Sequence, residues 1–220
     1  MEEINKPVDT KVAEPKLTLE SVKNKSHLEV DVTGQFDEVL SKLSEKVGAV
    51  LQPRPEGFHI TVIGPTESGK LKELTQEQLD KLSAINQKLQ SGQGVHIDGM
   101  GTIDGATRTD LKDADKPKKT SYIAFSSPDI QEFRKSIGLP EKDLHITLGF
   151  MDQGVDEKGN SKRGDIHMKI VGKDDKGKDK LAPIDKKSDA ALKDLFLQEF
   201  PKMHIKLGEL GGPDKQQKQK

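Results

Sequence analysis

Two short segments of this chain repeat one arrangement of chemically useful side chains. They read HITV at residues 59–62 and HITL at residues 145–148, so each tetrad places a histidine two positions before a threonine. An imidazole gains and loses protons near neutral pH, and a hydroxyl donates hydrogen bonds to anionic oxygen. Two such pairs around one concavity would suit attack on a phosphodiester. One imidazole would take a proton from water while the other protonates the leaving oxygen.

The spacing within each tetrad matters because side chains alternate across a β-strand. His59 and Thr61 would share one face of their strand, with apolar neighbours on the other. His145 and Thr147 would do the same in the second half. We therefore assign the two histidines as the acid/base pair, without deciding which is the acid. The two threonines are assigned as ligands of the substrate phosphate, and the scheme requires no metal or cofactor.

The tetrads also have a structural interpretation. A single His-x-Thr on a strand is more often a matter of packing than of catalysis. Here the motif occurs twice, with the same intervening isoleucine and with apolar residues on both sides. That repetition favours the functional interpretation. The copies are too far apart in sequence for one element, so they must belong to two equivalent halves.

The elements around the tetrads repeat as well. Apolar alternation predicts strands at 26–34, 58–64, 94–103, 120–127, 143–150, 165–172 and 203–210. Helical spacing predicts helices at 36–48, 75–92, 127–138 and 189–200, the third capped by Ser127 or Asp129. A strand-helix-strand-helix order thus begins again after Gly94. We expect one bilobal domain over residues 25–211.

Other segments lack such patterns. Residues 1–24 mix charged residues, proline and valine without a period, which predicts a disordered arm, and residues 212–220 form a polar tail. Charged, glycine-rich stretches at about 152–164 and 172–188 predict surface loops. These segments agree with a hydrophobic content of only 31%.

Composition excludes several classes of protein. The 220 residues include no cysteine, which rules out disulfides, thiolate metal sites and thiol nucleophiles. A net charge of −1 does not suit a protein that grips long nucleic-acid duplexes through many phosphates. No stretch has the length and apolarity of a membrane span or of a secretory leader. We therefore expect a cytoplasmic monomer that does not bind membranes.

A competing motif follows the first tetrad. Gly64, four further residues, Gly69 and Lys70 are spaced as in a phosphate-binding loop, which would make the protein a nucleotide triphosphatase. The next residue should supply a hydroxyl to magnesium, yet it is Leu71. No clear apolar strand ends in the aspartate that would complete a magnesium site. A surface loop leaving the first tetrad strand is the better interpretation.

Two more side chains are candidates for contact with a substrate. Tyr122, the only tyrosine, lies on an alternating strand, where its ring could face a cleft and stack on a base or could simply pack. His167 follows the second tetrad after a charged stretch and could return beside it. The other histidines fall on the polar sides of their strands, where solvation is the default: His27, His96 and His204.

With both tetrads placed, the chain resembles the two-histidine (2H) phosphoesterases, which include bacterial 2′,3′-cyclic RNA phosphodiesterases historically called 2′-5′ RNA ligases. Their signature is two copies of His-x-Thr/Ser among apolar residues, and LHITLGF at residues 144–150 is a particularly close match. The resemblance covers residues 26–150 in element order and, less closely, residues 166–210. It implies an α+β fold, bilobal and pseudo-symmetric, with antiparallel sheets lining a central cleft and helices outside. The charged insertions after Phe150 depart from a compact family member.

The expected function follows from the tetrads and the resemblance together. We expect a metal-independent phosphodiesterase that hydrolyses 2′,3′-cyclic phosphate or 2′-5′ phosphodiester bonds in RNA ends or small nucleotides. The alternative is a non-catalytic module of the same fold that binds a nucleotide or an RNA end.

Overall fold

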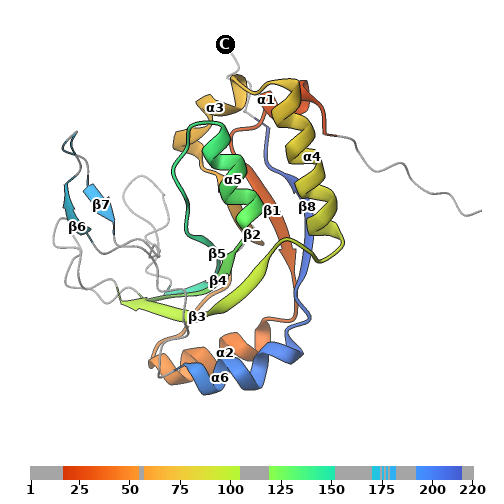
Figure 1. Ribbon diagram of the computed structural model, residues 1–220. Coiled ribbons are helices and arrows are strands. Elements are labelled where there is room, and N and C mark those ends of the chain that lie inside the picture. Colours follow the sequence, from red (N-terminus) through yellow and green to blue (C-terminus); the bar gives the residue numbers. More distant parts are fainter. Residues whose placement is uncertain are drawn as a thin grey trace, which may run out of the picture.

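The computed structural model describes residues 17–54, 57–104, 119–151, 170–173, 175, 177, 179–181 and 192–214 (Figure 1). Its α-helices are α1 (Leu19–Lys23), α2 (Asp37–Val47), α3 (Gly69–Lys72), α4 (Gln76–Gln90), α5 (Pro128–Ser136) and α6 (Lys193–Glu199). Its strands are β1 (Leu28–Thr33), β2 (Phe58–Ile63), β3 (His96–Asp104), β4 (Lys119–Ser126), β5 (Leu144–Phe150), β6 (Ile170–Lys173), β7 (Asp179–Leu181) and β8 (Lys206–Gly211). Two 3-10 turns are η1 (Pro65–Glu67) and η3 (Phe200–Lys202).

Six of the strands form two antiparallel three-stranded sheets. The first sheet has the order β2-β1-β8 and the second has the order β3-β4-β5, so β2 and β5 are both edge strands. These two edges contact each other, and they are the strands that carry the tetrads. The α+β fold class with antiparallel sheets is therefore confirmed. Strands β6 and β7 pair in a hairpin of their own.

The two halves correspond as β1-α2-β2 and β4-α5-β5. Each unit consists of a central strand, a connecting helix and a tetrad strand. Each helix packs toward the other unit: α5 contacts β2, and Leu40 of α2 lies so close to Gly149 of β5 that a larger residue there would collide with it. The expectation that the repeat begins after Gly94 is wrong by one strand, because β4 and not β3 corresponds to β1. Strands β3 and β8 are instead the third strands of the two sheets.

One hydrophobic core runs through both halves. Helices α4 and α5 lie side by side in the upper part of Figure 1, and α2 and α6 lie below the sheets. The apolar members of the tetrads are 0% exposed and belong to this core: Ile60, Val62, Ile146 and Leu148. The histidines and threonines between them are partly exposed. Both tetrads therefore show the predicted alternation, with the apolar side chains anchoring each strand.

Local chemistry explains the helix ends near the tetrad strands. Thr75 caps α4 and Ser127 caps α5, each accepting a backbone N–H with its side-chain oxygen. Of the two caps proposed for α5, Ser127 is therefore the one observed. Gly48 ends α2 with a φ of 64°, a conformation that glycine adopts without steric penalty.

Two predictions of irregular structure need correction. Residues 1–24 do not all form a disordered arm, because Leu19–Lys23 are helical and bury Val22 to 1% exposure against the core. The loop predicted at 172–188 contains β7, whose pairing with β6 supplies backbone hydrogen bonds that composition does not reveal. Residues 1–16, the loop at 152–164 and residues 215–220 of the tail lie outside the described residues.

The phosphate-loop alternative does not fit the structure after β2. Residues 65–67 form η1 and residues 69–72 form α3. The N–H of Gly64 donates to Glu67 Oε2 at 2.8 Å instead of pointing at an empty anion site. Lys70 pairs with Glu73 at 2.7 Å. A carboxylate of the chain itself thus satisfies the backbone donor that a phosphate would need.

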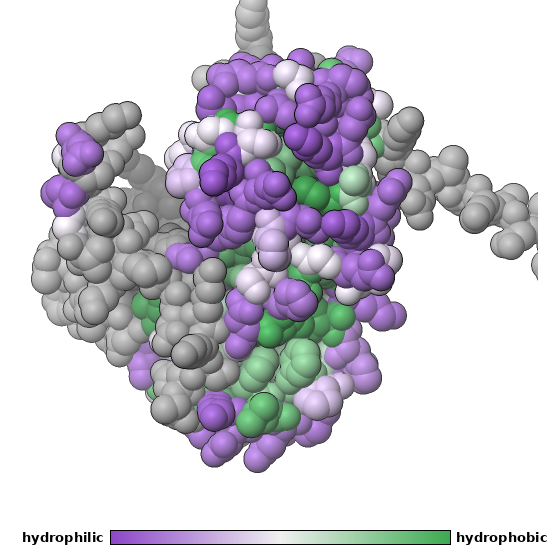
Figure 2. All heavy atoms as spheres, in the orientation of Figure 1, coloured by the Kyte–Doolittle hydropathy of each residue, from purple (hydrophilic) through white to green (hydrophobic). Residues whose placement is uncertain are grey.

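The surface differs between the two ends of the molecule. Figure 2 shows hydrophilic side chains over the upper part, where α4 and α5 lie, and more hydrophobic ones in the lower half. The large exposed hydrophobic side chains are Val50, Leu197 and Phe200 among the described residues. Within the described ranges, every helix is too short or too polar to cross a bilayer.

Arg134 of α5 ties the two halves together. Its side chain is only 1% exposed and donates to both oxygens of Glu67, at 2.8 and 3.1 Å. It also donates to the carbonyl of Val62 in β2 and to the carbonyl of Pro140 ahead of β5, the latter at 2.9 Å. Burial alone would raise the pKa of Glu67, but hydrogen bonds from Arg134 and Gly64 lower it overall. The network therefore links the end of β2 to the segment that precedes β5.

Replacing Arg134 by methionine should destabilise the fold by roughly 3–5 kcal/mol, because Glu67 would lose the guanidinium that binds both of its oxygens and would keep only the Gly64 N–H and Lys142 at 3.8 Å. Urea unfolding followed by circular dichroism measures the loss. The control is Lys88→Met, which breaks a more exposed pair with Asp129 and should cost less than about 1 kcal/mol. Equal losses in the two variants would show that Arg134 does not join the halves.

Candidate functional site

The first tetrad opens onto a cavity of about 620 Å³, a size suited to a small ligand. The described residues that line it are His27, Glu29, Arg54, His59, Thr61, Pro65 and Pro213. The side chain of His59 is 14% exposed, so its ring is shielded from bulk water without being sealed in the core. Both members of the first predicted pair, His59 and Thr61, therefore reach the same space.

Strand pairing places carboxylates beside this pair. On the β1–β2 ladder, Glu29 lies opposite Thr61 and Asp31 lies opposite His59. Residues that are directly opposite share a face of the sheet. Glu29 Oε2 lies 2.9 Å from His27 Nε2 and 3.4 Å from His59 Nε2. One carboxylate oxygen is thus placed between two imidazoles.

A guanidinium approaches the same histidine. Arg54 Nη1 lies 3.3 Å from His59 Nε2, and because a guanidinium only donates, Nε2 is the acceptor. Burial is the largest influence on the pKa of His59 and lowers it. Glu29 and Asp31 raise this pKa, whereas Arg54 and His27 lower it, and the net pKa lies below the ordinary histidine value. The environment therefore favours a neutral ring with its lone pair on Nε2.

The second tetrad has different surroundings. His145 and Thr147 are partly exposed on β5, but they do not line the cavity beside His59. His145 Nδ1 lies 2.8 Å from the carbonyl oxygen of Asp143, which only accepts, so Nδ1 carries a proton. Proton exchange by this ring is then left to Nε2. The fold brings the two tetrad strands into contact, whereas the cavity collects side chains of the first tetrad alone.

The cross-strand neighbours of the second tetrad on β4 are uncharged. Tyr122 lies opposite Thr147, and Ala124 lies opposite His145. The side chain of Tyr122 is only 3% exposed, and its ring approaches Gly101 so closely that a larger residue there would collide with it. Tyr122 therefore shares the face of the second tetrad, but its burial favours packing and not the stacking on a base considered from sequence.

The remaining histidines divide into two groups. His96 and His204 are exposed, as the default of solvation predicts. His27 departs from that default because its side chain is 20% exposed and forms part of the cavity wall. The predicted ligand residue His167 lies outside the described residues.

Arg54, like Glu29, is a site residue that the sequence patterns do not identify. It lies between Pro53 and Pro55, in a segment with neither strand nor helix periodicity. Only the path of the chain between α2 and β2 brings its guanidinium to His59. A single arginine close in sequence to a tetrad is a weak signal, because arginines are common on surfaces.

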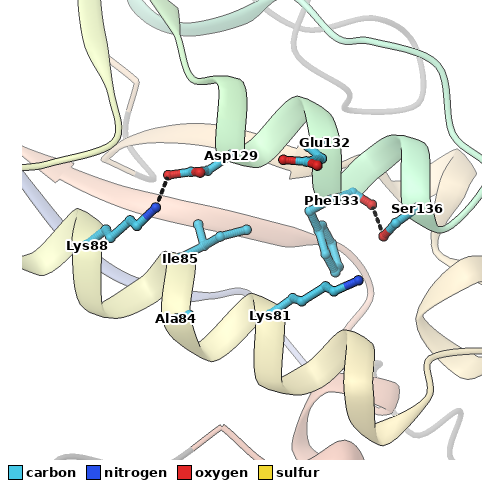
Figure 3. Close-up of a pocket in the computed structure, with 8 residues that line it drawn as sticks. All are labelled: Lys81, Ala84, Ile85, Lys88, Asp129, Glu132, Phe133 and Ser136. Carbon is cyan, nitrogen blue, oxygen red and sulfur yellow. Dashed lines mark hydrogen bonds and ion pairs between the residues drawn. The ribbon is translucent and has the colours of Figure 1, made fainter.

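A smaller cavity of about 290 Å³ lies between α4 and α5 (Figure 3). Lys88 and Asp129 at its rim already pair with each other at 2.8 Å. Ile85 and Phe133 extend between the two helices and give the cavity an apolar wall. No histidine or tetrad residue is present among its described lining residues. The cavity beside β2 is therefore the better candidate site.

Comparison with known proteins agrees with the geometry of the tetrads. A family model described as Swiss Army Knife, 2H phosphoesterase domain, matches residues 28–156, more than half of the chain. The chain belongs to the two-histidine phosphoesterase family. Both tetrads of this two-histidine phosphoesterase lie inside the matched range, which supports a phosphodiesterase-type function in general. No curated protein and no solved structure matches the chain significantly.

The two charged neighbours of His59 should move its pKa in opposite directions. Glu29→Gln removes a carboxylate that stabilises the imidazolium, so the pKa of His59 should fall further. Arg54→Gln removes a cation that disfavours the imidazolium, so this pKa should rise. NMR titration of the His59 ring protons measures both changes. Glu209→Gln, at an exposed carboxylate on β8, is the control, and shifts of one sign in both test variants would refute the assignment.

Proposed function

We propose that this two-histidine phosphoesterase is a metal-independent phosphodiesterase that hydrolyses 2′,3′-cyclic phosphate or 2′-5′ phosphodiester bonds in RNA ends or small nucleotides. One observation carries the proposal. The two strands with the His-x-Thr motif are edge strands that contact each other, and each keeps its histidine and threonine partly exposed. This arrangement supports a phosphate held between the strands, and family membership supports the type of reaction.

His59 is assigned as the general base. Its pKa is lowered, and the hydrogen bond from Arg54 leaves the lone pair on Nε2. In the proposed reaction, Nε2 takes a proton from water while the water oxygen forms a bond to phosphorus. His145 gives a proton to the alcohol oxygen as its bond to phosphorus breaks. Water is thereby added across one P–O bond, which yields a phosphomonoester and an alcohol.

Charge on the phosphate requires hydrogen-bond donors. In the proposal the hydroxyls of Thr61 and Thr147 donate to the non-bridging oxygens, whose negative charge grows as water attacks. Arg54 adds a cation 3.3 Å from the ring of His59, within reach of the same oxygens. Its guanidinium would offset the negative charge that Glu29 places on the same wall.

Alanine at His59 or at His145 should lower kcat/KM by roughly 100-fold or more, because each change removes one proton-transfer group. Valine at Thr61 or at Thr147 should lower kcat by roughly 100-fold through loss of one donor to the phosphate. The substrates are 2′,3′-cyclic AMP and 2′-5′-linked diadenylate, assayed in excess EDTA, where the parent should remain active.

The control for these variants is His96→Ala, which removes an exposed histidine from the edge strand β3 and should leave kcat/KM unchanged. Activity that disappears in EDTA, or that survives loss of either tetrad histidine, would contradict the proposal. Binding of nucleotides by the parent, with no hydrolysis of either substrate, would favour the non-catalytic module instead.

A further inference from the structure

Glu29 is an unexpected group for a site that binds an anion. It lines the cavity beside β2, and its side chain is 14% exposed. Its Oε2 contacts two imidazoles, while its Oε1 has no hydrogen-bond partner among the described residues. A carboxylate repels phosphate oxygens, so its favourable partner in a ligand is a neutral group that donates a hydrogen bond.

The carboxylate of Glu29 is held in place by His27. Ser26 Oγ lies 3.0 Å from His27 Nδ1 and 3.2 Å from the carbonyl oxygen of Pro213, which positions the ring of His27. His27 Nε2 donates to Glu29 Oε2 at 2.9 Å. A donor of this kind fixes Oε2 and leaves Oε1 as the available acceptor.

The distance from His59 limits which part of a ligand Glu29 can meet. Glu29 lies directly opposite Thr61, and its Oε2 is 3.4 Å from Nε2 of His59. If His59 and Thr61 bind the phosphate, the ribose carbon next to the esterified one lies close to Glu29. The substituents of that carbon would then contact the Glu29 carboxylate. In a 2′-phosphate the glycosidic nitrogen lies as many bonds from phosphorus as the 3′-OH, but it carries no hydrogen and the N–H groups of the base lie further away. The hydroxyl on the adjacent C3′ is therefore the hydrogen-bond donor within reach.

The second half of the fold has no carboxylate at the matching positions of β4. Tyr122 takes the place of Glu29 in the correspondence of β4 with β1, and Ala124 takes the place of Asp31. A substrate with a hydroxyl next to its phosphate would therefore bind in one orientation, with that hydroxyl toward β1.

We propose that Glu29 is a specificity-determining residue that accepts a hydrogen bond from a ribose hydroxyl vicinal to the bound phosphate. The substrate class is a ribonucleotide phosphodiester with a free neighbouring hydroxyl, as in a 2′-5′ linkage with its 3′-OH. The inference rests on the proposed function, because it takes the phosphate to lie between His59 and Thr61.

The test compares two ligands that do not react. Adenosine 2′-phosphate carries the 3′-OH, and 3′-deoxyadenosine 2′-phosphate lacks it. Isothermal titration calorimetry on the parent should give a Kd roughly 10- to 100-fold lower for the hydroxylated ligand, the range for a hydrogen bond to a charged acceptor. In Glu29→Ala the two Kd values should become similar. In Glu29→Gln part of the preference should remain, because the amide oxygen still accepts.

Asp31→Asn is the matched control. Asp31 also acts on His59 through its charge, but it is exposed and does not line the cavity. The preference for the hydroxylated ligand should survive in this variant. If Asp31→Asn abolishes the preference as Glu29→Ala does, the effect is one of general charge and the contact with Glu29 is refuted.

Failure of this inference can be told apart from failure of the proposed function. If the parent hydrolyses 2′-5′-linked diadenylate but binds the two monophosphates with equal affinity, the proposed function is supported and the role of Glu29 is refuted. If the parent prefers the hydroxylated monophosphate in a way that depends on Glu29 but hydrolyses no substrate, the role of Glu29 is supported and the proposed function is refuted. Absence of binding by the parent at millimolar ligand overturns the inference.

Discussion

A single buried guanidinium joins the two halves of this phosphoesterase. Arg134 extends from the helix of one half to a backbone carbonyl in the tetrad strand of the other, and Glu67 balances its charge. A buried charge without such partners would be strongly unfavourable, so the ion pair permits few arrangements of β2 and β5. The contact of the two tetrad strands, and with it any shared chemistry, depends on this geometry.

The two halves share a motif but not an environment. Carboxylates of β1 stand opposite the first tetrad, whereas a buried ring and a methyl group stand opposite the second. Burial and Arg54 lower the pKa of His59 and favour its neutral form, although the nearby carboxylates raise this pKa. A duplicated motif can therefore supply two chemically distinct histidines, because cross-strand neighbours are not duplicated with it.

Much of the secondary structure follows from local patterns. Three features depend on residues close in sequence: the alternation around both tetrads, the apolar faces of α2, α4 and α5, and the cap at Ser127. The errors occur where contacts between distant segments decide. Helix α1 forms where Val22 meets the core, and the true repeat begins at β4 because β3 and β8 each join a sheet as its third strand.

The sequence by itself determined the two His-x-Thr tetrads, the strands that carry them and the family, because alternation and motif are local properties of the chain. Only the tertiary structure decided that β2 and β5 meet as sheet edges and that Arg54, Glu29 and His27 surround His59. Those residues are adjacent through pairing across strands and the path of a connecting segment. Neither has a periodic signature, so the electrostatic character of the site emerges only when the chain is folded.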